Sequence, residues 1–144
     1  MLRYEIPRVS VMSHAEGGCL CGAIRYRVTG VPSWSTICHC RACRKASGAP
    51  SVGWLTFDRG NFRLLQGVPG RFGSSAGVLR TFCTICGTSL TYATEGRPED
   101  IDVATVSLDD ETIFPPTCEV WVAHKVSWEI ADPAREQCPG DAGG

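Results

Sequence analysis

The sequence has no long apolar run and no excess of charge of one sign. None of its apolar stretches approaches the ~20 residues that a membrane-spanning helix needs. Residues 1–11 also lack the apolar core of a secretory signal peptide. The formal net charge is −1, which gives no electrostatic reason to expect a nucleic-acid or anionic-membrane partner. We therefore expect a cytoplasmic protein with no nucleic-acid and no membrane partner.

The sequence also lacks an internal repeat of the solenoid type and a linker between domains. Its 144 residues are enough for one domain with a real hydrophobic core. Apolar residues make up 43% of the chain and charged residues 20%, which is ordinary for a globular protein. The composition therefore indicates a single globular domain.

Cysteine, by contrast, is abundant, with an odd total of nine. Without a secretion signal, thiols that hold a metal explain this number better than a disulfide framework. The densest group is the C-x-C-x-x-C formed by Cys38, Cys40 and Cys43. Thiolates this close repel one another unless a cation lies between them, and zinc is the usual metal for sulfur ligands. Three free or disulfide-bonded cysteines are the less favoured alternative.

Two cysteine pairs lie elsewhere in the chain. Cys19 and Cys21 form a C-x-C between glycines, and in an extended segment residues i and i+2 point to the same face. Cys83 and Cys86 form a C-x-x-C followed by Gly87, which is typical of a zinc knuckle. For the first pair, two small buried apolar side chains remain the alternative.

Ligand counting favours two zinc sites. The C-x-C and the C-x-x-C together supply four thiolates for a closed structural site, whereas the triplet Cys38, Cys40 and Cys43 leaves one position open, as catalytic zinc requires. An internal fourth ligand would close that position. The candidates for it are Cys118, Cys138, His14, His39 and His124.

The charge of the triplet site indicates which chemistry it suits. Three thiolates and Zn²⁺ sum to about −1, which weakens the pull on a bound water. Such a site is better suited to stabilise a further thiolate, as nucleophile or leaving group. Arg41, Arg44 and Lys45 can offset the negative charge or hold substrate carboxylates, or they can be solvated surface bases.

The remaining pattern predicts strands and little helix. Residues 23–28 alternate apolar and basic side chains, as in a half-buried strand. Residues 41–47 form a short helix with a stop at Gly48, and the glycine-rich residues 67–77 form a surface loop. The predicted fold class is all-β, with twisted antiparallel sheets. Further strands are expected at residues 52–57, 62–65, 78–82, 90–92, 101–108 and 120–122.

Together these motifs resemble the glutathione-dependent formaldehyde-activating enzyme family, which includes the centromere-protein-V-like proteins. The resemblance rests on G-G-C-x-C-G, C-H-C-x-x-C, S-G at Ser47 and Gly48, F-C-x-x-C-G and S-L-D-D from Ser107, and it runs from about Gly17 to Trp128. It implies a tent-like all-β fold clamped by zinc. It also implies a structural zinc at Cys19, Cys21, Cys83 and Cys86 and a catalytic zinc at Cys38, Cys40 and Cys43.

The resemblance implies a zinc-dependent carbon–sulfur lyase that makes or breaks S-(hydroxymethyl)glutathione, or acts on the adduct of another small thiol. One departure stands at Glu119, where family members often carry a histidine before the apolar–Trp pair. If that histidine shapes the substrate site, the substrate differs. Two other functions are compatible with the sequence: a noncatalytic zinc-stabilised interaction module, and a redox or metal-buffering protein.

On this basis the chain divides into an N-terminal lead-in segment at 1–16, a zinc-binding domain at 17–132 and a loose C-terminal tail at 133–144. Two zinc ions per chain and a small thiol partner such as glutathione are expected. The protein is expected to be a monomer or a homodimer.

Overall fold

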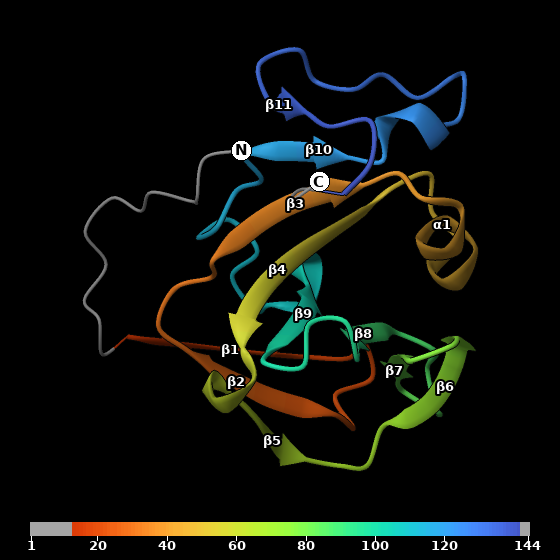
Figure 1. Cartoon of the computed structure of the whole chain (residues 1–144). Helices are drawn as coiled ribbons and strands as arrows, with labels where there is room; N and C mark the ends of the chain where they lie inside the picture. Colours follow the sequence, from red (N-terminus) through yellow and green to blue (C-terminus); the bar gives the residue numbers. More distant parts are fainter. Residues whose placement is uncertain (1–12, 142–144) are drawn as a thin grey trace.

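The computed structural model describes residues 13–141, which form two β-sheets that lean against each other (Figure 1). The smaller sheet has the order β1-β2-β5, and the larger has the order β11-β10-β3-β4-β9-β8-β7-β6. The all-β prediction is confirmed. The strands of the smaller sheet are β1 (His14–Gly18), β2 (Arg25–Thr29) and β5 (Phe62–Gln66). Those of the larger are β3 (Trp34–Cys38), β4 (Val52–Asp58), β6 (Gly70–Ser75), β7 (Val78–Phe82), β8 (Ser89–Thr94), β9 (Asp100–Ala104), β10 (Cys118–Val120) and β11 (Glu136–Gln137).

Within the described residues, helical structure is limited to short pieces at the ends of strands. These are α1 (Arg41–Ser47) and the 3₁₀ turns η1 (Arg59–Asn61), η2 (Thr105–Ser107) and η3 (Val122–His124). Among residues 13–141, no helix is long and apolar enough to cross a membrane. Neighbouring strands are antiparallel, as predicted, except that β10 runs parallel to both β3 and β11.

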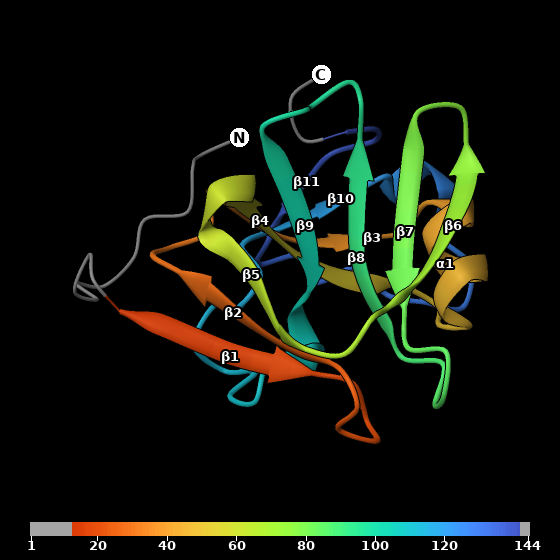
Figure 2. The same ribbon diagram turned by 90° about the horizontal axis from the view of Figure 1, so that it is seen from below.

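The main core lies between the two sheets. The alternation predicted for residues 23–28 is confirmed, because Ile24, Tyr26 and Val28 are at most 3% exposed. Their partners on the larger sheet are apolar side chains that include Leu55, Phe57, Leu90 and Val103. Figure 2 shows the strands of the smaller sheet running across the direction of β8 and β9.

Two contacts join the sheets near Gly17. The Tyr26 hydroxyl lies 2.6 Å from Ser107 Oγ, and Gly17 forms an isolated bridge with Leu108. A Cβ at Gly17 would overlap the Ser107 carbonyl and the Tyr26 hydroxyl, so glycine is required for this close approach.

The central strand β4 separates the core from a second side of the larger sheet. Because successive side chains point to opposite faces, Leu55 and Phe57 enter the core, while Trp54 and Thr56 face the other way. A second apolar cluster lies on that other face, around Trp54, Cys43 and Val120. The candidate functional site is built there.

Helix α1 forms as the sequence predicts. Cys40 precedes the helix in an extended conformation, and its sulfur accepts a hydrogen bond from the Cys43 amide. Gly48 follows the helix with φ 65° and ψ 28°, a left-handed conformation that glycine adopts without strain. The helix therefore holds the last two cysteines of the triplet in fixed relation.

The structure corrects three expectations. Residues 67–77 are not a loop, since β6 pairs with β7 over five registered positions. The strand expected at 101–108 ends at Ala104, where η2 begins. The strand expected at 120–122 ends at Val120, because Trp121 takes a left-handed φ of 56° and η3 follows.

The predicted tail also differs within the part that the structure describes. Rather than being loose, it contributes β11, and the Cys138 amide donates to the Glu119 carbonyl at 2.8 Å. Parallel pairing with β10 supplies these bonds, which the local sequence pattern does not reveal. Of the lead-in segment, residues 1–12 lie outside the described range, and His14 begins β1. The division into a lead-in, a domain and a tail stays a prediction.

Candidate metal centres and the adjoining cavity

Four cysteines from distant parts of the chain meet between the two sheets. Cys19, Cys21, Cys83 and Cys86 place their sulfurs within 4.8 Å of one another. The Sγ atoms of Cys19 and Cys21 are 3.6 Å apart, and those of Cys21 and Cys83 are 3.8 Å apart. A tetrahedral site with Zn–S bonds of about 2.3 Å separates its sulfurs by about 3.8 Å. The spacing of this donor set therefore fits zinc.

Backbone and side-chain donors surround these sulfurs. The Ile24 amide donates to Cys19 Sγ at 3.2 Å, and the Ile85 amide donates to Cys83 Sγ at 3.4 Å. The contact with Thr88 lowers the pKa of Cys86 to about 5. Hydrogen bonds of this kind favour the thiolate form, which is the form that binds a metal.

The triplet forms a second group at the end of β3 and the start of α1. Cys38, Cys40 and Cys43 also have their sulfurs within 4.8 Å of one another. Hydrogen bonds from Cys38 and Cys43 hold the pKa of Cys40 far below its usual range, while the contacts of Cys38 with Cys40 and Cys43 raise the pKa of Cys38. One thiolate is thus stabilised at the expense of a neighbour, and a divalent cation between them would let all three ionise. This donor set also fits zinc.

Among residues 13–141, no fourth histidine, cysteine or carboxylate joins the triplet within the same distance. His39 points away from it and lies 2.6 Å from Glu119 Oε1. Cys118 is buried against the Ser35 carbonyl, and Cys138 packs against the apolar cluster around Trp54. His14 lies on β1 in the other sheet. Of the five candidate ligands, His124 lines the same cavity as the triplet but stays outside the cysteine group.

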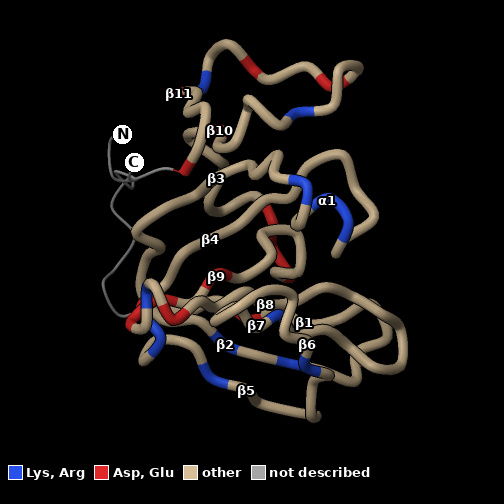
Figure 3. The backbone as a smooth tube through the Cα atoms, turned by 45° about the vertical axis from the view of Figure 1, so that its right-hand side comes forward, with Lys and Arg blue, Asp and Glu red and all other residues tan. Residues whose placement is uncertain are grey.

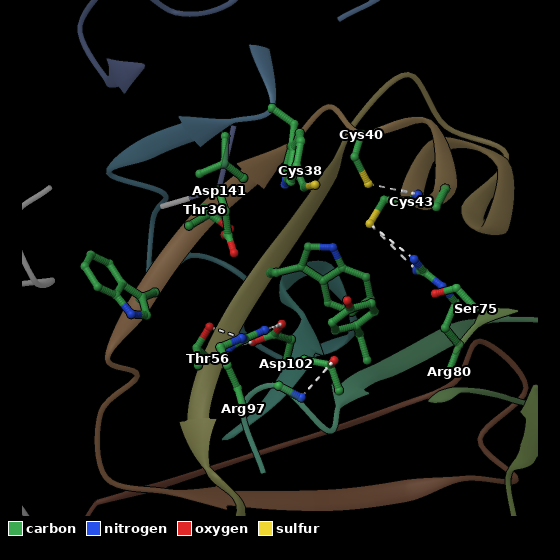
Figure 4. A pocket seen from close by; sticks show the side chains of 18 of the residues that line it. Thr36, Cys38, Cys40, Cys43, Thr56, Ser75, Arg80, Arg97, Asp102 and Asp141 are labelled. Atoms are coloured by element: carbon green, nitrogen blue, oxygen red, sulfur yellow. Dashed lines mark hydrogen bonds and ion pairs between the residues drawn. The ribbon is translucent and has the colours of Figure 1, made fainter. Parts of the chain in front are cut away.

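The triplet opens onto a cavity of about 700 Å³ on the outer face of the larger sheet (Figure 4). Side chains at alternate positions of five strands form its floor: Trp34, Thr36 and Cys38 of β3, Trp54 and Thr56 of β4, Arg80 of β7, Tyr92 and Thr94 of β8, and Asp102 of β9. Helix α1 and residues 120–124 border it. This volume is in the usual range for a small-molecule site.

Trp121 stands at the border of this cavity with an unusual backbone. Its φ of 56° is the one positive value among the non-glycine residues from 13 to 141. Its indole packs edge-on against the His124 ring, with centroids 5.3 Å apart. Strained backbone at a cavity wall is typical of a functional site.

A polar network covers part of the floor. Thr56 Oγ1 donates to Asp102 Oδ1 at 2.6 Å, and Arg97 donates to Asp102 Oδ2 at 2.7 Å. Burial raises the pKa of Asp102 above its usual value, although Arg97 and Thr56 oppose this effect. Arg97 lines the cavity with a side chain that is 37% exposed, and it also pairs with Asp100 at 3.2 Å.

One arginine contacts the triplet directly. Arg80 is 6% exposed, and its two terminal nitrogens lie 3.7 and 3.6 Å from Cys43 Sγ. Its Nε donates to Ser74 Oγ at 3.0 Å, and its guanidinium carbon lies 4.9 Å from the centre of the Tyr92 ring. These contacts fix the guanidinium beside the sulfur.

The bases that the sequence placed near the triplet have different roles. Helix α1 carries Arg41, Arg44 and Lys45 (Figure 3). Arg41 lines the cavity, whereas Arg44 donates to the carbonyls of His39 and His124 and so serves the local structure. Lys45 borders a separate depression between α1 and β6–β7.

The sequence analysis did not identify Arg80, Arg97 and Asp102. Arg80 and Asp102 are buried charged residues within strands, between buried or half-buried neighbours. A charged residue in the middle of a mostly apolar strand is the signal that could have identified them. The pairing of Arg97 with Asp102 depends on the turn after β8, and no local pattern indicates it.

Glu119 does not line the cavity. It is 2% exposed and faces His39, the Asp132 amide and Arg135 instead. The presence of glutamate instead of histidine at this position therefore does not change the wall of the cavity directly. Glu119 ties residues 132–135 to the loop that carries the triplet.

Comparison with known proteins agrees with these motifs. The family model for the glutathione-dependent formaldehyde-activating enzyme matches residues 14–124. The chain belongs to this family. An uncharacterized lyase of Schizosaccharomyces pombe is 32% identical over 87 residues, which cover 60% of this chain and 63% of that protein. The match thus spans less than two thirds of the relative's length.

The fold also recurs in a crystal structure of a Rhodobacter sphaeroides protein. The similarity has a TM-score of 0.54 at 23% sequence identity and covers 66% of this chain and 88% of the other. At this identity the likeness supports the shared fold alone. The family membership therefore rests on the sequence match rather than on this structure.

Proposed function

We propose that the protein is a zinc-dependent carbon–sulfur lyase that acts on the adduct of a small thiol, such as S-(hydroxymethyl)glutathione. The observation that carries this proposal is the position of the triplet on the wall of a 700 Å³ cavity, with no fourth protein ligand among residues 13–141. Family membership and the lyase name of the yeast relative support the reaction class. Glutathione as the thiol follows from the family name.

In this proposal Cys38, Cys40 and Cys43 hold the catalytic zinc. The zinc supplies positive charge that stabilises a thiolate in the cavity. Cys19, Cys21, Cys83 and Cys86 hold a second, structural zinc, which gives two ions per chain. None of the nine cysteines forms a disulfide, so all seven proposed ligands can bind metal as thiolates.

The chain's own residues contribute binding and orientation. Arg41 supplies positive charge for a carboxylate of a peptide-like thiol, whereas Arg97 is already paired with Asp100 and Asp102. Trp54 and Tyr92, whose ring centroids are 6.1 Å apart, give an apolar surface along one side. Together these groups bring the adduct's sulfur toward the triplet.

The proposed reaction breaks or forms one carbon–sulfur bond of the adduct. In the breakdown direction, the carbon–sulfur bond of the adduct breaks and its electron pair stays on sulfur. The hydroxyl oxygen forms the carbonyl of formaldehyde and releases its proton to water. In the forming direction the thiolate sulfur attacks the carbonyl carbon, and the resulting alkoxide takes up a proton.

The test combines binding with turnover. Cobalt(II)-substituted protein is titrated with glutathione, and a change in the visible spectrum reports thiolate binding. Turnover of the adduct is then compared with the Cys40→Ser protein, because the uncatalysed reaction is already fast. Cys138→Ser serves as a matched control, since this cysteine belongs to neither group.

We expect glutathione to change the cobalt spectrum in the unmodified protein and in Cys138→Ser, with loss of both binding and turnover in Cys40→Ser. A spectrum that small thiols leave unchanged, together with turnover equal to that of Cys40→Ser, would contradict the lyase proposal. The noncatalytic interaction module would then be the better explanation.

A further inference from the structure

Arg80 is a buried cation that has no carboxylate partner in the part of the chain that the structure describes. Within residues 13–141 the ion pairs of arginine involve Arg25, Arg27, Arg97 and Arg135, and none involves Arg80. Arginine stays protonated at any physiological pH. Burying an uncompensated charge is costly, so a side chain that is 6% exposed needs an anion nearby.

The contacts of Arg80 leave one group that can be this anion. Ser74 Oγ, which accepts from Nε, is neutral, and so is the Tyr92 ring under the guanidinium. The remaining contact is Cys43 Sγ, which faces both terminal nitrogens at 3.6 and 3.7 Å (Figure 4). The Ser74 hydroxyl and the Tyr92 ring hold the guanidinium so that its two terminal nitrogens face the sulfur.

The charges of the site then sum to zero. Three thiolates and one divalent ion carry about −1, and Arg80 adds +1. We propose that Arg80 is the built-in countercation of the triplet, a positioning residue that acts through Cys43. This inference rests on the proposed function, in which an anionic thiolate must enter the same site.

The consequence concerns which ligands the site accepts. With Arg80 in place, an incoming thiolate approaches a neutral centre; without Arg80, it approaches a centre that already carries a negative charge. At the effective dielectric of a partly buried site, a unit charge several Å away changes the affinity of an anion by about ten- to a hundredfold. Imidazole carries no net charge as a ligand, so the loss of Arg80 changes its affinity little. Arg80 therefore favours thiolates over neutral ligands.

A second consequence concerns the sulfur itself. Two N–H donors on Cys43 Sγ stabilise its electron pairs and make it a weaker electron donor. In cobalt(II)-substituted protein, loss of these donors should move the sulfur-to-metal charge-transfer band to lower energy. This effect needs no added ligand.

The experiment uses the cobalt(II)-substituted full chain in four forms: unmodified, Arg80→Met, Arg80→Lys and Arg71→Met. Arg71 is an exposed arginine on the neighbouring strand β6 and lies outside the cavity, so its loss changes the net charge equally without touching the triplet. The four-thiolate site contributes the same absorption to all four. Circular dichroism and metal content confirm that each variant is folded and loaded.

We expect the charge-transfer band to move to lower energy in Arg80→Met, partly in Arg80→Lys and not in Arg71→Met. Glutathione affinity should fall ten- to a hundredfold in Arg80→Met and recover largely in Arg80→Lys, while imidazole affinity stays within about twofold in all forms. An unshifted band, or an equal loss of affinity for glutathione and imidazole, would overturn the inference. If Arg80→Met does not fold, Arg80→Lys tests the inference alone. This variant keeps the charge but offers no two-nitrogen fork, so its band should still move partly to lower energy.

Glutathione binding tests the proposed lyase, whereas the ligand-free band tests the effect of Arg80 on Cys43. If glutathione binds to no form, including the unmodified protein, the lyase proposal fails. The ligand-free band shift still decides whether Arg80 acts on Cys43.

Discussion

His39 Nε2 lies 2.6 Å from Glu119 Oε1, although the two residues are 80 positions apart and both are at most 2% exposed. His39 stands between Cys38 and Cys40, so this contact anchors the loop that carries the triplet. Glu119 also accepts hydrogen bonds from the Asp132 amide at 2.6 Å and from Arg135 at 3.3 Å. The pair thus connects the candidate site with the C-terminal segment.

Replacement of Glu119 by glutamine should destabilise the protein, and the loss should depend on pH. Burial alone raises the pKa of Glu119, but hydrogen bonds from His39, the Asp132 amide and Arg135 outweigh this effect and hold the pKa below its usual value. A carboxyl with a lowered pKa in the folded state stabilises the protein above its unfolded pKa of about 4.3, and this contribution is lost as the pH falls through the folded pKa.

We therefore expect Glu119→Gln to lower the free energy of unfolding by about 2–3 kcal/mol at pH 7, with a smaller difference below about pH 4. Urea unfolding between pH 3 and pH 7 measures this difference. Glu111→Gln, at an exposed position, is the control and should change little. If the difference in the free energy of unfolding stays constant over this pH range, the ionised carboxylate is not its source.

The two cysteine groups should differ in what they support. Cys83 is 1% exposed and belongs to the group that joins the smaller sheet to the β7–β8 hairpin, whereas Cys40 lies on the cavity wall. A structural zinc site can contribute about 10–16 kcal/mol, comparable to the total stability of ~5–15 kcal/mol for a domain. Cys83→Ser should therefore lower the melting temperature far more than Cys40→Ser. If thermal melts show the same decrease in melting temperature for both variants, the triplet is structural too.

The sequence predicted the local parts of the site well. Helix α1 and its stop at Gly48 follow from short-range rules, and each cysteine motif brings its own sulfurs together because the spacing is one turn or one strand repeat. The alternation of Ile24, Tyr26 and Val28 likewise predicted which side chains of β2, and of the residue before it, enter the core. These features depend on residues within a few positions of one another.

The missed features depend on contacts between distant segments. Strand β6 is glycine-rich and mostly exposed, so it has no apolar alternation, and its pairing with β7 alone defines it. The Arg80–Cys43 contact spans 37 positions and the His39–Glu119 contact spans 80. Neither pair has a signal in the surrounding sequence beyond a charge at a buried strand position.

Stepwise removal of metal should separate the two groups. Freshly purified protein should hold two zinc ions per chain, and the triplet should lose its ion first because three protein ligands hold it less firmly than four. Metal analysis during titration with a chelator should show two phases. Mass spectrometry after alkylation should find Cys38, Cys40 and Cys43 modified in the first phase, and Cys83 and Cys86 modified in the second. A single phase, with the triplet alkylated from the start, would contradict a second metal site.

A hydrogen bond joins Tyr26 of β2 to Ser107 in the turn η2, which follows β9. Ser107 Oγ donates to the Ala104 carbonyl at 2.7 Å, so the Tyr26 hydroxyl, 2.6 Å from the same oxygen, must be the donor in their hydrogen bond. Burial raises the pKa of Tyr26 to about 12, although the contact with Ser107 opposes this. A group whose pKa is raised in the folded state stabilises the protein below its unfolded pKa, near 10, and this contribution is lost between about pH 10 and pH 12.

Tyr26→Phe should therefore cost about 1 kcal/mol at pH 8, the typical net value of one hydrogen bond. Because phenylalanine does not ionise, the variant should also lack the alkaline loss, which amounts to about 1.4 kcal/mol per pH unit across that interval. The difference in the free energy of unfolding between the two proteins should shrink to zero and then change sign as the pH rises toward 12. Urea unfolding of both proteins at pH 8, 9, 10 and 11 measures it, and the ionisation of the cysteines cancels in the comparison. A gap that does not change with pH would mean that the Tyr26 hydroxyl ionises as readily in the folded protein as in the unfolded chain.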